Sequence, residues 1–162
     1  MTGIQEQLEA LLTETKKLHE RNELSKTVGP EWYEPGKMEY LEQSDSLWEP
    51  ETGCLTLHFE SRGTRYDGRS ELIEHLHVGD PITLHRDPKN PYNPNNFIIM
   101  TQRNEDVGNM PAELCNVIAP LYDAGILNFD SAEVSFLEPL SQRSRHARQA
   151  VLFVRVICNV CT

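Results

Sequence analysis

The sequence lacks the features that mark several large classes of protein. It contains no run of about 18 apolar residues, so no membrane-spanning helix is expected. Its N-terminus has neither the basic block nor the apolar block of a secretory signal peptide, which favours a cytoplasmic location. No Gly-x-x-x-x-Gly-Lys loop is present to hold nucleotide phosphates. ATP hydrolysis by this chain is therefore not expected.

Catalytic and metal-binding patterns are also missing. The sequence shows no Ser–His–Asp spacing, no His-Glu-x-x-His and no paired acidic motif, so the chain is not expected to be an enzyme. Of the four cysteines, only Cys158 and Cys161 lie close together. A zinc site needs a second pair of ligands, and Cys54 and Cys115 stand alone. We therefore predict reduced thiols, no metal site and no cofactor.

Positive charge is scarce overall, and it is unevenly distributed. The formal net charge is −10, which by itself disfavours nucleic acid because phosphates repel an acidic surface. Residues 1–60 contain 13 acidic and five basic side chains, whereas residues 61–162 contain 12 and 10. Residues 141–155 include four arginines, one histidine and no acidic residue. The later part of the sequence therefore offers a basic segment to an anionic partner.

The residue pattern divides the chain into three parts. Residues 1–23 predict an N-terminal amphipathic helix of about five turns. The residues that recur at helical spacing, and so form one stripe along the helix, are Ile4, Leu8, Leu11, Leu12, Thr15 and Leu18. Such a helix is marginal alone, so we expect it to pack on the rest of the chain, to pair with a second copy in a homodimer, or to bind another protein. Residues 24–53 form an acidic arm rich in proline and glycine, whose tryptophans indicate contact with the domain predicted at 54–160.

The domain is predicted to be mainly β (α+β). Leu55, Leu57 and Phe59 alternate with polar residues, which is typical of a strand with one buried face. Further strands are expected at 81–86, 97–100, 107–109, 126–138 and 150–158, and a short helix or extended segment at 71–76. Pro111 is expected to start the one long helix and Gly125 to end it. This order suits a small closed or partly open barrel with the helix at one end.

Four ordered motifs carry a family resemblance. They are Arg62-Gly63-x-x-Tyr66-x-Gly68-Arg69, Val78-Gly79-Asp80, Asp87-Pro88-x-Asn90-Pro91-Tyr92-Asn93-x-Asn95 and Val107-Gly108-x-x-Pro111-x-Glu113-Leu114. Their order and spacing resemble the HIRAN domain family, whose bacterial members stand alone and whose other members are attached to SNF2-type helicases. The resemblance implies an OB-like barrel that binds single-stranded DNA or 3′ DNA ends. It also implies a repair, replication or mobile-element setting.

The resemblance implies which loops hold the ligand. Arg65 would contact a phosphate, Tyr66 would stack on a base or pack against a sugar, and Tyr92 would stack on a second base. Each such stack is worth roughly 1–3 kcal/mol. Asn93 follows Tyr92 where many members have aspartate, and its amide would accept a hydrogen bond from a 3′-hydroxyl without charge assistance.

Three more positions complete the implied interface. Asn109 stands where animal helicase members have histidine, and Ala112 stands where they have a lysine that would strengthen phosphate binding. Arg69, which closes the first motif, is a further candidate contact. Asn90 is expected to tie the proline-rich loop to its own backbone, and Tyr122 is expected to pack against the core.

A basic stripe lies between the last two predicted strands and consists of Arg143, Arg145, His146 and Arg148. Loops in this position border the groove of OB-type barrels, so these arginines are predicted to contact nucleic acid. The alternative is a solvated loop. Two other functions stay open: a protein-interaction adaptor that docks a partner through residues 1–50, and, as the weakest, a nuclease or other hydrolase. The sequence does not separate DNA from RNA.

Overall fold

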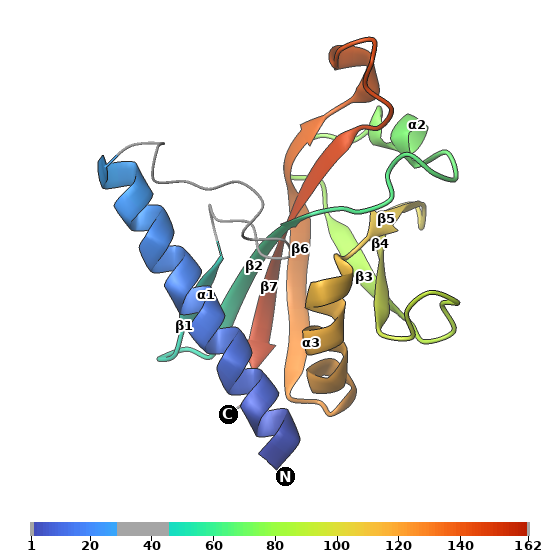
Figure 1. Ribbon diagram of the computed structural model, residues 1–162. Coiled ribbons are helices and arrows are strands. Elements are labelled where there is room, and N and C mark those ends of the chain that lie inside the picture. Colours follow the sequence, from blue (N-terminus) through green and yellow to red (C-terminus); the bar gives the residue numbers. More distant parts are fainter. Residues whose placement is uncertain (1, 29–45, 162) are drawn as a thin grey trace.

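The computed structural model describes residues 2–28 and 46–161 and has an α+β fold (Figure 1). Its elements are α1 (Thr2–Val28), β1 (Leu47–Glu49), β2 (Cys54–Glu60), α2 (Arg69–Ile73), β3 (Ile82–Asp87), β4 (Asn96–Thr101), β5 (Asp106–Asn109), α3 (Ala112–Asp123), β6 (Leu127–Glu138), the 3-10 helix η2 (Leu140–Gln142) and β7 (Val151–Val160). The fold class is confirmed. The expected strands and long helix of the domain are present, each within one or two residues of the predicted bounds.

The strands form two antiparallel sheets. One has the order β1-β2-β7-β6 and the other the order β3-β4-β5. A single bridge between Arg62 and Asn109 joins the sheets on one side, and a single bridge between Pro81 and Glu133 joins them on the other. The sheets therefore surround one core without a continuous ladder, and the barrel is not closed. Bulges in β6, between Phe129 and Ser131 and between Val134 and Phe136, let this long strand bend along the sheet.

The core lies between the two sheets and α3. Alternation along β2 buries Leu55, Leu57 and Phe59 completely, as a strand with one inward face requires. Leu114, Ile118 and Leu121 on α3 are also fully buried, because they recur on one face of the helix. Three aromatic rings, one each from β4, α3 and β6, pack together at the core: Phe97 contacts Tyr122 and Phe129 edge-on, and Tyr122 stacks on Phe129. The packing role predicted for Tyr122 is confirmed.

Helix α1 packs on the domain along its first half. Leu8, Leu11 and Thr15 are buried, and the helix contacts α3 and β1 (Figure 1). The Thr15 hydroxyl donates to the carbonyl of Leu11 at 2.8 Å. Of the three expectations for this stripe, packing on the chain itself is confirmed, whereas a homodimer and a different partner stay predictions. The helix runs to Val28 and not to residue 23.

The predicted acidic arm is described only at its end. Residues 46–53 include β1, which pairs with β2, and Trp48 packs against the core. The arm therefore contacts the domain there, whereas residues 29–45, including Trp32, lie outside the described residues. Within the described part of the chain, no helix is long and apolar enough to cross a membrane. No group of three His, Cys, Asp or Glu side chains there is placed to hold a metal ion.

Candidate nucleic-acid interface

Three hydrogen bonds hold the loop after β2 against the end of the β6–β7 connection. The Thr64 hydroxyl donates to the carbonyl of Ala150 at 2.7 Å, and the Ser70 hydroxyl donates to the carbonyl of Thr64 at 2.7 Å. The amide of Ala150 in turn donates to the Ser70 oxygen at 3.0 Å. All three residues are buried. Residues 61–69 and the start of β7 are therefore fixed relative to each other.

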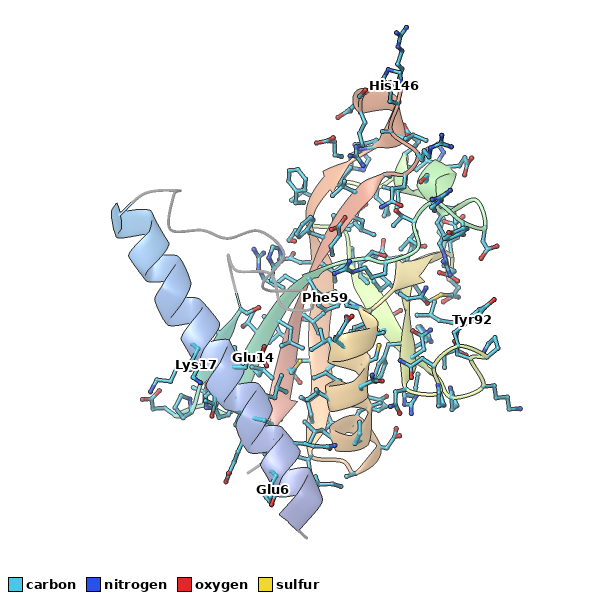
Figure 2. The ribbon with its side chains drawn as sticks, viewed as in Figure 1. Glu6, Glu14, Lys17, Phe59, Tyr92 and His146 are labelled. Atoms are coloured by element: carbon cyan, nitrogen blue, oxygen red, sulfur yellow. The ribbon has the colours of Figure 1, made fainter. Side chains whose placement is uncertain are left out.

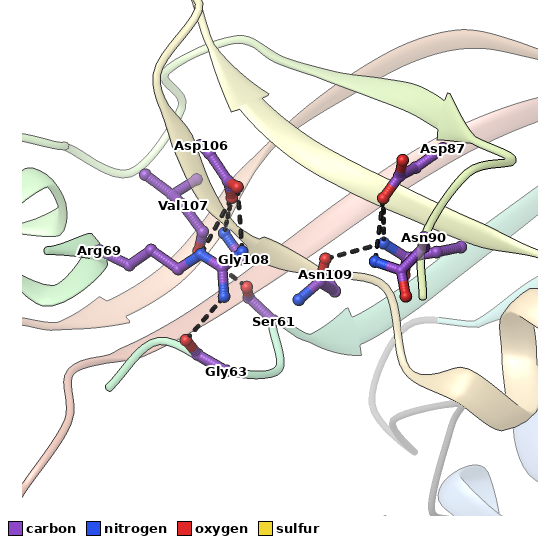
Figure 3. A network of polar contacts seen from close by, with 10 residues as sticks. Ser61, Gly63, Arg69, Asp87, Asn90, Asp106, Val107, Gly108 and Asn109 are labelled. Carbon is purple, nitrogen blue, oxygen red and sulfur yellow. Dashed lines mark hydrogen bonds and ion pairs between the residues drawn. The ribbon is translucent and has the colours of Figure 1, made fainter. Parts of the chain in front are cut away.

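An internal ion pair fixes the other side of the same loop (Figure 3). Arg69 donates through Nε and Nη2 to the two carboxylate oxygens of Asp106, at 3.1 and 2.9 Å, and through Nη1 to the carbonyl of Gly63 at 3.0 Å. Only 8% of Arg69 is exposed. This geometry gives Arg69 an internal role, and its predicted contact with nucleic acid stays a prediction. A planar guanidinium suits it because both carboxylate oxygens are engaged at once.

Close backbone approach explains Gly108 in the fourth motif. Its φ is +133°, and a Cβ there would lie 1.9 Å from Ser61 Oγ and 2.9 Å from the carbonyl oxygen of Arg62. The Ser61 hydroxyl donates to the carbonyl of Val107 at 2.9 Å. Only a residue without a side chain allows β5 to lie this close to the end of β2. The single Arg62–Asn109 bridge forms at this point.

A chain of side-chain amides joins that bridge to the proline-rich loop, residues 88–95 (Figure 3). Asn96 Nδ2 donates to Asn109 Oδ1 at 3.0 Å and to Asp87 Oδ2 at 3.2 Å. Asn90 Nδ2 donates to the same Asp87 oxygen at 3.0 Å. Asn109 is partly buried, and its side chain already accepts a hydrogen bond from Asn96 on the neighbouring strand β4, which sets its position. The predicted contact of Asn109 with nucleic acid stays a prediction.

Hydrogen bonds to Asn90 and Asn116 fix the proline-rich loop that carries Tyr92. Asn90 Oδ1 accepts hydrogen bonds from the amides of Tyr92 and Asn93 at 2.9 and 3.0 Å, so its predicted tie to the loop backbone is confirmed. Asn93 and Asn95 both donate their side-chain amides to Asn116 Oδ1 on α3, at 3.1 and 3.2 Å. Tyr92 is 94% exposed, and its side chain points outward on the side away from α1 (Figure 2). The loop thus holds a large ring in solvent on a fixed base.

Arg65 and Tyr66 form a second aromatic and cationic pair. Tyr66 is 56% exposed, and the Arg65 guanidinium lies over its ring, 5.2 Å from the centroid. A cation placed over a ring is attracted by its negative face. Both residues lie in the loop that Thr64 and Arg69 fix from opposite sides. The pair is therefore presented to solvent by a rigid turn.

Residues 55–151 match the HIRAN domain family. The chain belongs to this family. A crystal structure of a protein from Lactobacillus plantarum is 21% identical, with a TM-score of 0.50 over 64% of this chain and 95% of that one. The human HLTF HIRAN domain is 20% identical in its crystal structure (TM-score 0.48, 67% and 81% covered) and 18% identical in an NMR structure of its DNA-bound conformation (0.42, 65% and 75%). The Lactobacillus structure supports the fold, and no curated protein matches the chain significantly.

The structure of this HIRAN domain separates the arginines of the basic stripe. Arg143 pairs with Glu138 through Nε at 3.1 Å and donates through Nη1 to the carbonyl of Gln149 at 2.7 Å. It closes the base of the β6–β7 loop, and its predicted contact with nucleic acid stays a prediction. The Arg145 and Arg148 side chains are exposed, and neither forms a hydrogen bond or ion pair with another residue of the described ranges 2–28 and 46–161.

Several residues of the HIRAN interface escape prediction from the sequence. Asp106 positions Arg69, and Asn116 positions the Tyr92 loop. In each case the two partners are distant in sequence. Lys89 is exposed in the same loop, three residues before Tyr92, and a cation within an aromatic loop was the signal that could have indicated it. Burial raises the pKa of the Glu60 carboxyl, although Arg62 and Arg143 act in the opposite direction.

Proposed function

We propose that this HIRAN domain binds single-stranded nucleic acid and holds a strand end at the Tyr92 loop. One observation carries the proposal: an aromatic ring that is 94% exposed stands on a loop with four amide hydrogen bonds at its base. Such a loop does not bury the ring in the core, so the ring is available to stack on a base. Arg65 and Tyr66 add a cation and a second ring, and Lys89 adds an exposed cation to the loop of the first.

DNA is the ligand to test first. The HIRAN domain of HLTF, a member of the same family, has been described in a DNA-bound conformation. Asn93 gives the proposal its finer part: its Oδ1 accepts from the amide of Asn95 at 3.0 Å, and the second lone pair of this oxygen is the proposed acceptor for a terminal hydroxyl. The strand end we propose is a 3′ end, in a repair, replication or mobile-element setting.

Fluorescence anisotropy at low salt tests this function. The ligand is a 20-nucleotide single strand with a 5′ fluorophore and either a free 3′-hydroxyl or a blocked 3′ end. Tyr92→Ala should weaken binding about 5- to 150-fold, the equivalent of one lost stack of roughly 1–3 kcal/mol. Phe136→Ala is the matched control, since this exposed ring lies on β6 outside the loops. Equal affinity of wild type and Tyr92→Ala would refute the proposal, and equal affinity for both ends would refute its 3′-end part.

We further propose that the domain acts as a binding module and not as an enzyme. The expected result is that an end-labelled strand stays intact after incubation with the protein and Mg²⁺. Cleavage that EDTA abolishes would support a nuclease instead. The adaptor function would be favoured if a chain lacking residues 1–50 bound DNA as weakly as the full chain. A sharp rise in affinity would show that residues 1–50 compete with DNA.

A further inference from the structure

The loop between β6 and β7 carries two arginines, Arg145 and Arg148, that pair with no acidic side chain of the described residues. Residues 139–162 contain no acidic side chain. Arg145, His146 and Arg148 are exposed there, and Figure 2 shows His146 at an extremity of the molecule, away from both Tyr92 and α1. We call residues 144–148 the arginine loop. Its side chains are Ser, Arg, His, Ala and Arg, so it has no large apolar group that could enter a membrane or the core of a protein interface.

Two acidic side chains hold the base of this loop. Ser141 donates to the Glu74 carboxylate through its amide at 3.1 Å and through its hydroxyl at 2.5 Å. These hydrogen bonds lower the pKa of Glu74. Glu138 pairs with Arg143 at 3.1 Å. Both carboxylates therefore stabilise the start of the loop, and no acidic side chain among the described residues pairs with Arg145 or Arg148.

The arginine loop continues the proposed interface. Arg148 is two residues from Ala150, which is hydrogen-bonded to Thr64 and Ser70. Thr64 directly precedes Arg65. The exposed groups therefore form a row on the surface, from Tyr92 through Tyr66 and Arg65 to the arginine loop. Figure 1 shows the segment before α2 between the Tyr92 loop and the β6–β7 loop. Each step of this path is held by hydrogen bonds within the domain.

We propose that Arg145 and Arg148 contact the phosphodiester backbone of a bound strand several nucleotides away from the end held at Tyr92. The ligand is then a strand long enough to reach from one loop to the other, and not an isolated end. This inference rests on the proposed function. Guanidinium groups suit it because each presents a fork of donors to phosphate oxygens and stays charged at any physiological pH.

The test combines strand length with salt dependence. Affinities are measured for single strands of 4 to 24 nucleotides over a range of salt, for wild type, the double variant Arg145→Gln/Arg148→Gln and the control Lys16→Gln/Lys17→Gln. The control removes the same number of charges from exposed positions on α1. For the longest strand, the arginine variant should reduce the slope of log K against log salt by about 0.7 per lost contact, or about 1.4 in total. That change corresponds to about 25-fold weaker binding at 0.1 M salt.

The dependence on length separates this inference from the proposed function. Wild-type affinity should rise in a step at the length that reaches the arginine loop, and the variant should lack the step while matching wild type on the shortest strands. An unchanged slope on every strand, or an equal loss at every length, would refute the inference even if Tyr92→Ala still weakened binding. Absence of wild-type binding to every strand would refute the proposed function and this inference together. Both arginines are exposed, so thermal unfolding of the variant should match wild type.

Discussion

Replacing Arg69 by glutamine distinguishes an internal residue from a ligand contact. The change removes two charge-assisted hydrogen bonds to Asp106 and one to the carbonyl of Gly63. The Arg69 side chain is 10% exposed and that of Asp106 is 38% exposed. Breaking a fully buried pair costs about 3–5 kcal/mol, and the partial hydration of Asp106 reduces this cost. We expect the free energy of unfolding to fall by about 3 kcal/mol, which lowers Tm by roughly 6–12 °C for a chain of this size.

Urea unfolding followed by circular dichroism measures the loss, and anisotropy in parallel measures DNA binding. Asp106→Asn is the partner variant, and the double variant should lose less than the sum of the two single changes because the residues interact. Below the unfolding transition, the salt slope of binding should equal that of wild type, because Asp106 and Gly63 already engage the Arg69 guanidinium. A stability change under 1 kcal/mol together with a smaller salt slope would refute this role and restore Arg69 as a ligand contact.

Three further predictions concern the core and its close contacts. Gly108→Ala should destabilise the domain by at least about 3 kcal/mol in urea, since its Cβ would overlap Ser61 Oγ; wild-type stability would show that β5 does not lie this close. Leu11→Ala should cost about 2–5 kcal/mol, because Leu11 is buried between α1 and the domain; a negligible loss would mean that α1 is not docked. Burial raises the pKa of the Cys115 thiol from 9.0 to about 11, so the folded state binds more protons than the unfolded state between these values. Stability should therefore fall as pH rises from about 9 to about 11, and less so in Cys115→Ala; equal pH profiles would refute this.

Local patterns predicted most of the domain. Alternation at Leu55, Leu57 and Phe59 predicted β2, and the prolines and glycines marked the turns between strands. Gly125, with φ +74°, follows α3 as expected. These features depend on neighbours within a few residues, which is why the sequence alone indicates them. The same holds for Asn90, whose bonds reach only two and three residues along the chain.

The distribution of roles among the arginines could not be predicted. Arg69 and Asp106 are 37 residues apart in sequence, and only the approach of β5 to the loop after β2 brings them together. Arg143 and Arg145 look equivalent in the basic stripe, yet one pairs with Glu138 and the other is exposed. Charge patterns show that cations are present, whereas the tertiary structure decides which of them are neutralised within the protein.

The way the two sheets are joined has a mechanical consequence. The loop of Tyr66 follows β2 in one sheet and the loop of Tyr92 precedes β4 in the other, so the spacing of the two rings depends on these joints. The Arg62–Asn109 bridge and the Arg69–Asp106 pair connect the sheets on one side, and the Pro81–Glu133 bridge connects them on the other. A flexible ligand that contacts both rings must therefore adapt to their separation, because the protein holds it fixed.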